Sequence, residues 1–107
     1  MQEDLAANGR QLVAIVDPHI KRVDDLYVYK EAQTLDILYK QADGKSEFEG
    51  WCWTGSSAWT DFFNPKSWDW WIGLFKFDKF KGSARNLFVW NDMNEVGPLT
   101  CRRLLRR

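Results

Sequence analysis

The chain has 107 residues, in which 15 Lys and Arg residues balance 15 Asp and Glu residues. A molecule without net charge offers nothing over its whole extent that would attract nucleic acid or an anionic membrane surface. No apolar run approaches the roughly 20 residues of a membrane span, and the first residues lack the pattern of a signal peptide. We therefore predict no nucleic-acid partner and no transmembrane segment.

Residues that bind metals or form disulfides are scarce. Cys52 and Cys101 are too few for a disulfide framework, and His19 is the only histidine. Because no other histidine or cysteine stands at ligand spacing from His19, we predict no metal site and no cofactor.

The first half of the chain begins with the pattern of an α/β protein. Residues 2–7 are typical of the end of a helix, with Gly9 placed to cap it. Leu12 to Val16 is a continuous apolar run, typical of a strand buried on both faces, and Asp17 follows it at the carboxyl end. Asp17 is thus either a substrate contact or an ordinary turn residue.

The middle of the chain is predicted to be an excursion between two strands of the sheet. Residues 26–35 indicate a short helix, and residues 37–39 and 47–50 indicate a hairpin around the turn Asp43-Gly44. Residues 51–57 are predicted to form a loop in which Trp51 and Trp53 share one face. We expect Trp51 to pack beneath that loop.

A third predicted helix and a second buried strand complete the pattern. Asn64-Pro65 is a helix start, and the stripe Trp68, Trp71, Ile72 and Phe75 at helical spacing predicts a core-facing side. Leu87 to Trp90 is the next buried strand. Asp92 follows it, where a carboxylate is either a nucleophile or proton carrier or part of an Asx turn that closes the strand.

Four motifs together resemble glycoside hydrolase family 31, the α-glucosidases and their relatives. They are the segments Val13 to Lys21, Glu49 to Gly55, Asp61 to Pro65 and Trp90 to Glu95, in the family's order and spacing. Thr54 stands where the second motif has proline. The resemblance covers residues 5 to 95 and stops after Glu95, where the family continues with Pro-Ser and this chain with Val96-Gly97.

The resemblance implies an α/β fold that is a partial (β/α)8 TIM barrel. We expect about two barrel strands with connecting helices and an inserted hairpin or loop, since a whole barrel needs about 250 residues. Residues 1–95 would belong to the catalytic barrel of family 31, and residues 96–107 would form a divergent basic tail. Strand edges and aromatic stripes of a partial barrel would be uncovered, so we expect poor solubility or oligomerisation.

The resemblance also implies roles for individual residues. Asp92 corresponds to the catalytic nucleophile, and Asp17 to a residue that hydrogen-bonds the hydroxyls of the terminal glucose. The walls of the glucose subsite would be Trp53, Trp90 and Met93. In the family the acid/base comes from a later barrel strand, which this sequence does not contain, so the chain by itself is expected to be inactive.

The implied activity is retaining hydrolysis of terminal α-linked glucose, in particular glucose trimming of N-glycans. The substrate would be an α-glucoside or a glucosylated N-glycan, and the partner would be a regulatory β subunit. The parent enzyme would be located in the lumen of the endoplasmic reticulum. Two alternatives stay open. One is a non-catalytic carbohydrate-binding module that uses Trp51, Trp53 and Trp59 as a stacking platform, and the other is a truncated product without a function.

Overall fold

The computed structural model describes residues 1–80 and 82–96. Their helices and strands, in chain order, are α1 (Gln2–Ala7), β1 (Leu12–Val16), β2 (His19–Lys21), α2 (Tyr27–Thr34), β3 (Gly50–Cys52), β4 (Gly55–Trp59), α3 (Lys66–Leu74) and β5 (Leu87–Asn91). All three predicted helices and both long predicted strands are present, but neither strand is buried as predicted. No helix among the described residues has the length and apolar character needed to cross a bilayer.

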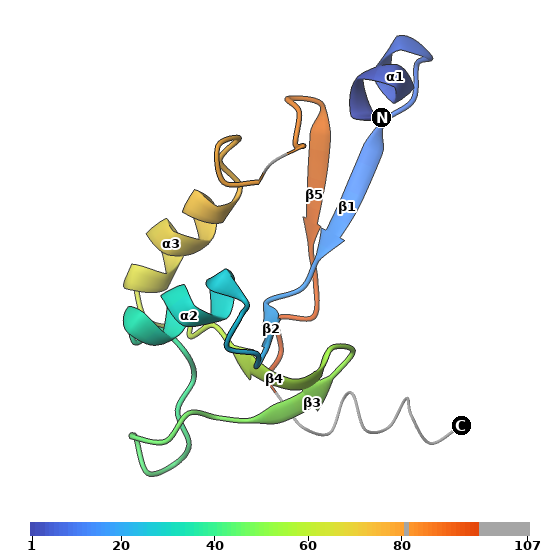
Figure 1. The fold of residues 1–107 in the computed structure, drawn as a ribbon. Coiled ribbons are helices and arrows are strands. Elements are labelled where there is room, and N and C mark those ends of the chain that lie inside the picture. Colours follow the sequence, from blue (N-terminus) through green and yellow to red (C-terminus); the bar gives the residue numbers. More distant parts are fainter. Residues whose placement is uncertain (81, 97–107) are drawn as a thin grey trace, which may run out of the picture.

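Strands β1 and β5 form a two-stranded parallel sheet, which we call the ribbon (Figure 1). The register pairs Leu12 with Leu87 and Val16 with Asn91, although some 70 residues separate the two strands in sequence. A parallel pair needs a crossover connection, and α3 lies within it, as in the repeating unit of a (β/α) barrel. The prediction of a partial barrel is therefore confirmed, because the described residues supply two parallel strands and do not close a barrel.

The excursion between the two ribbon strands forms a second, antiparallel sheet in the order β2-β4-β3. The prediction of a loop over residues 51–57 is wrong, because β3 and β4 form a hairpin in which Cys52 pairs with Gly55. Gly55 has φ of +91°, a conformation that glycine adopts without strain, and it ends the two-residue turn. The hydroxyl of Thr54 lies 2.8 Å from that of Ser57 and so restrains this turn.

The hairpin predicted over residues 37–50 is reduced to one isolated antiparallel bridge, Lys40 with Glu47, while Leu38 pairs with Thr60 outside it. The predicted turn at Asp43-Gly44 is present, with Gly44 at φ of +66°. One carboxylate oxygen of Asp43 accepts hydrogen bonds from the backbone N–H groups of Lys45 and Ser46. The turn thus depends on its side chain as well as on its glycine.

The core lies between α2 and the antiparallel sheet. Its main cluster consists of Ile20, Tyr29, Ala32, Ile37, Leu38 and Ala58. A second cluster joins Cys52 and Trp59 to partly buried Tyr39, Phe48, Met93 and Val96. Both clusters are built mainly from the excursion, and neither contains a residue of β1 or β5.

Helix α3 meets this core through a different side from the one predicted. The helix starts close to the predicted place but begins at Lys66, so that Pro65 and not Asn64 occupies the N-cap position. Asn64 Oδ1 nevertheless accepts the N–H of Lys66 at 3.1 Å. Within the predicted stripe, however, Trp68 is 55% and Ile72 is 65% exposed. Trp70 packs against the main cluster instead, and Ser67 is the buried residue of the helix. The prediction of a core-facing stripe is therefore wrong for Trp68 and Ile72.

Candidate functional site

Two carboxylates come directly after neighbouring strands at the same edge of the ribbon. Val16 and Asn91 are the last paired residues, Asp17 and Asp92 follow them, and the N–H of Asp92 donates to the carbonyl oxygen of Val16 at 3.3 Å. This is the carboxyl edge of a parallel sheet, where (β/α) barrels place their reacting groups. The structure therefore brings the two acids singled out in the sequence to one edge.

Asp17 is the more buried of the two acids. Its side chain is 21% exposed, and its Oδ1 is buried without a hydrogen bond to any described residue. Its Oδ2 lies 4.0 Å from Nε2 of the buried His19. Burial lowers the pKa of His19, against the opposing effect of the Asp17 carboxylate, so the imidazole is neutral at pH 7. Asp17 is thus held partly desolvated beside a neutral ring.

Asp92 is exposed, and its backbone leaves the ribbon at once. Its Oδ1 accepts the N–H of Met93 at 2.9 Å, and Met93 has φ of +55°. This left-handed conformation is uncommon for a residue with a long side chain. It turns the chain so that Met93 packs on the Cys52 and Trp59 cluster. This bond comes from the next residue and not from the residue after it, as it would in an Asx turn, and it fixes the carboxylate of Asp92 without burying it.

Successive residues of β5 face opposite sides of the ribbon. The indole N–H of Trp71 donates to Asn91 Oδ1 at 3.3 Å, so Asn91 faces α3. Trp90 therefore faces the other side, where it is 54% exposed. Next to Asn91 is a hollow of about 400 Å³, lined by Tyr39, Phe62, Phe63, Trp71, Asn91 and Asn94.

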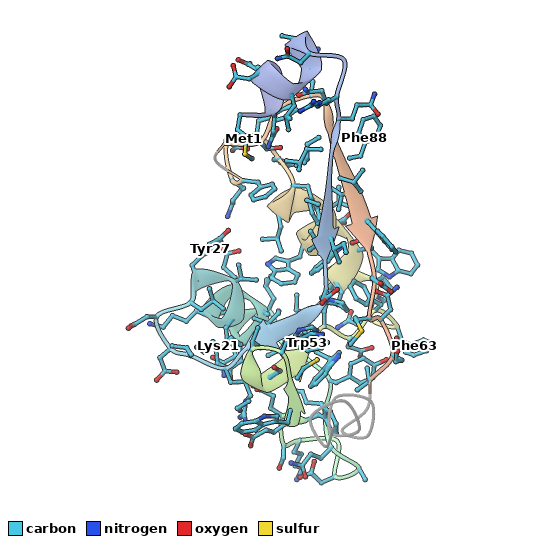
Figure 2. All side chains as sticks on the ribbon, turned by 90° about the vertical axis from the view of Figure 1, so that its right-hand side faces the viewer. Met1, Lys21, Tyr27, Trp53, Phe63 and Phe88 are labelled. Atoms are coloured by element: carbon cyan, nitrogen blue, oxygen red, sulfur yellow. The ribbon has the colours of Figure 1, made fainter. Side chains whose placement is uncertain are left out.

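Neither Asp17 nor Asp92 lines that hollow. The hollow itself was not predicted from the sequence. The only available signal was the spacing of Asn91 and Asn94 on either side of Asp92. Phe63 is 87% exposed and projects from the side of the molecule in Figure 2. Because Phe62 and Phe63 lack a helical or alternating pattern, their exposure could not be read from the sequence.

Trp53, predicted to form a wall of the glucose subsite, lies at the turn of the β3–β4 hairpin. In sequence it is distant from both strands of the ribbon. It is 65% exposed, and Trp51 on the same side is 51% exposed, so the expected packing of Trp51 beneath a loop is wrong. Cys52 between them is buried in the cluster on which Met93 packs. That packing connects the hairpin with the segment after Asp92.

The three-indole platform is contradicted by the position of Trp59. Its side chain is only 2% exposed, and its ring lies against those of His19 and Phe48. A buried indole cannot stack on a sugar. Within the part of the chain that the structure describes, no three His, Cys, Asp or Glu side chains are grouped so that they could hold a metal ion.

Residues 1–104 match the model of the glycosyl hydrolases family 31 TIM-barrel domain. The chain belongs to glycosyl hydrolase family 31. This match runs past Glu95, where the resemblance of the motifs stops. Of the predicted basic tail only Val96 is within the described residues.

Relatives of this family 31 chain are much longer than it is. The chain is 54% identical over 96 residues to neutral alpha-glucosidase AB of Sus scrofa, which covers 89% of this chain and 10% of that protein. Among solved structures, the glucosidase II alpha subunit in its Glc1Man2-bound form matches with a TM-score of 0.82 and 54% identity, over 87% of this chain and 10% of the other.

A third match is the structure of an ER glucosidase II heterodimeric complex, which consists of the catalytic subunit and the binding domain of the regulatory subunit. It matches with a TM-score of 0.82 and 55% identity, and again covers 87% of this chain and 10% of the other. The chain thus spans about a tenth of these proteins, and its fold is the fold of the corresponding segment.

Proposed function

We propose that this chain carries the nucleophile of a retaining α-glucosidase and lacks its acid/base, so that it hydrolyses nothing by itself. Asp92 would attack the anomeric carbon of a terminal glucose, and Asp17 would hydrogen-bond the hydroxyls of the same sugar. Trp53, Trp90 and Met93 would line the subsite. The single observation that carries the proposal is the parallel register of β1 and β5, because it brings both acids to one carboxyl edge.

The retaining route explains why one carboxylate is not enough. A first carboxylate forms a covalent glucosyl intermediate, while a second carboxyl group, about 5–5.5 Å away, protonates the departing oxygen and later deprotonates water. Glu95 is exposed and lies beyond the turn at Met93, so it does not continue the strand that presents Asp92. We assign the acid/base role to none of the described residues.

The proposed substrate is α-linked glucose at a non-reducing end, and more narrowly the glucosylated N-glycan. The name of the porcine relative and the Glc1Man2 ligand of the solved subunit support this class of substrate. By the same likeness we propose a regulatory subunit as partner and the lumen of the endoplasmic reticulum as the location of the parent enzyme.

The nucleophile can be tested apart from the missing acid. α-Glucosyl fluoride has a leaving group that departs as an anion and needs little protonation, so a chain with a competent Asp92 should accept one glucosyl unit. We expect a mass increase of one glucosyl residue on a peptide that contains Asp92, and none in the variant Asp92→Asn. An unmodified Asp92 after prolonged exposure would argue against its role as the nucleophile.

The proposed inactivity has its own assay. We expect no steady turnover of nitrophenyl α-glucoside by the purified chain, because the second half of the reaction needs a base to activate water. Turnover that disappears in Asp92→Asn would show that the chain contains a complete site. Titration with glucose or maltose, followed by tryptophan fluorescence, would distinguish a binding protein from an inert product.

A further inference from the structure

The segment that leads into the β3–β4 hairpin has two chemically different sides. One side contacts Trp59: the ring of Phe48 lies 5.8 Å from the Trp59 ring, and a Cβ atom added to Gly50 would come within 2.4 Å of it. Cys52 belongs to the same buried cluster. The alternating residues Glu47 and Glu49 face the other way, towards Arg22, on the side where Trp51 and Trp53 are exposed.

Arg22 binds both of these carboxylates at once. Its Nε donates to Glu47 Oε1 at 2.8 Å, and its Nη1 lies 2.7 Å from Glu49 Oε2. Its backbone N–H donates to the carbonyl oxygen of Ser56 in β4, which extends the pairing of β2 and β4 by one residue. A lysine at this position could not reproduce the arrangement, because its single ammonium group lacks the planar fork of donors.

The two arms of this cluster differ in burial. Glu47 is 17% exposed and also accepts hydrogen bonds from the Tyr29 hydroxyl at 2.8 Å and from Gln33 at 3.2 Å, both in α2. Glu49 is 52% exposed and accepts the hydroxyl of Ser56 at 2.5 Å. The Glu47 arm therefore connects Arg22 with α2, whereas the Glu49 arm connects it with the hairpin.

Arg22 keeps its charge at every physiological pH. Burial by itself lowers the pKa of the guanidinium, but the hydrogen bond to Tyr29, the charge of Glu47 and the bond to Glu49 together raise it above its usual value. The Ser56 hydroxyl and then Arg22 lower the pKa of Glu49, so this carboxyl group is ionised as well. Arg22 and Glu49 therefore stay oppositely charged near neutrality, and the contact between them is a permanent structural link.

From this geometry we propose that Arg22 is a positioning residue: by holding Glu47 and Glu49 together it fixes the β3–β4 hairpin and thereby the place of Trp53. The importance of Trp53 for sugar binding rests on the proposed function, whereas the clamp itself does not rest on it. Arg22, Glu47 and Glu49 together are called the hairpin clamp below.

The clamp is tested on the complete chain without sugar, by hydrogen exchange and mass spectrometry. In Arg22→Lys we expect peptides covering residues 47–56 to exchange about tenfold faster or more, as befits the loss of hydrogen bonds to charged groups. In Glu49→Gln the increase should be smaller and confined to residues 50–56. Peptides of the ribbon, residues 87–92, should not change.

Lys79→Met is the matched control. It also disrupts an ion pair, here the pair of Lys79 with Glu31 at 3.1 Å, but outside the clamp. We expect exchange over residues 47–56 to stay as in the unchanged chain. Equal exchange in Arg22→Lys and the control would overturn the clamp, and so would an equal increase in every peptide, which would mean a general loss of stability.

Positioning of Trp53 has a spectroscopic signature. Subtracting the near-ultraviolet circular dichroism spectrum of Trp53→Phe from that of the unchanged chain gives the signal of the Trp53 indole. An indole gives such a signal when its surroundings are fixed. We expect this contribution to disappear in the Arg22→Lys background and to persist in the Lys79→Met background; its persistence in both would refute the positioning role. Maltose titration then separates the proposals, because failure of the unchanged chain to bind sugar counts only against the proposed function.

Discussion

The antiparallel part of the molecule and the parallel ribbon, which Figure 1 shows as two separate sheets, differ most clearly in burial. The antiparallel sheet and α2 contribute most of the buried residues, and β4 contains three of them in succession. Neither β1 nor β5 contains a buried residue, and neither does α1. The part that carries the proposed nucleophile is therefore not the part that holds the described structure together.

The difference follows from the two kinds of sheet. Antiparallel strands can be joined by short turns and need cover on one face only, so the excursion builds its main cluster within one stretch of the chain, Ile20 to Ala58. Parallel strands are normally covered on both faces, and here side chains on both strands stay about half exposed, including Val13, Ile15, Phe88 and Trp90. Figure 2 shows Phe88 at the end of the ribbon remote from Trp53.

The same substitution in both regions should give the largest difference in stability. Ile37 is 0% and Ile15 is 58% exposed. We expect Ile37→Ala to lower the free energy of unfolding by about 2–5 kcal/mol, because it leaves a cavity in the core. Ile15→Ala should change it by less than about 0.5 kcal/mol. Urea unfolding followed by far-ultraviolet circular dichroism measures both values, and equal losses would show that the ribbon is covered in solution.

Glycine replacements sharpen the comparison on a smaller scale. A Cβ atom at Gly50 would approach the Trp59 ring to 2.4 Å, whereas nothing lies within 4 Å of a Cβ atom at Gly73 in α3. We expect Gly50→Ala to cost about 1–3 kcal/mol by overpacking. Gly73→Ala should stabilise the helix by about 0.5–1 kcal/mol. Thermal unfolding of the two variants checks the signs, and a neutral Gly50→Ala would show that β3 is not held against Trp59.

The elements of the ribbon could be predicted because their sequences contain the signal. Leu12 to Val16 and Leu87 to Trp90 are continuous apolar runs, and the structure has strands there. The hairpin β3–β4 could not be found in the same way, since Gly55, Ser56 and Ser57 have low strand propensity. The contacts around this hairpin, such as the close approach of Gly50 to Trp59 and the ion pairs of Arg22 with Glu47 and Glu49, cannot be read from the local sequence.

The candidate site shows the same limit. That Asp17 and Asp92 follow strands was visible in the sequence, and the parallel register places them at one edge. Exposure was not visible: the stripe Trp68 and Ile72 has helical spacing whether or not another surface covers it. The functional roles of Asp17, Trp53, Trp90, Asp92 and Met93 stay predictions, which the glucosyl fluoride and titration experiments address.

The smallest expected change in stability comes from making the ribbon polar. Val13 and Phe88 are register partners and are 56% and 50% exposed. The pair Val13→Lys and Phe88→Glu places opposite charges side by side on neighbouring strands, so the free energy of unfolding should change by no more than about 0.5 kcal/mol. Self-association of the chain should nevertheless decrease, because exposed apolar strands with open edges promote it.

Size-exclusion chromatography with light scattering measures that association. We expect the unchanged chain to elute as oligomers and the double variant to shift towards the monomer, while Val23→Lys, on a residue 37% exposed outside the ribbon, should elute like the unchanged chain. A sharp monomer peak and a cooperative melt for the unchanged chain would contradict the expected association. A large loss of stability in the double variant would instead mean that these side chains are buried in solution, and the contrast between ribbon and core would then have to be abandoned.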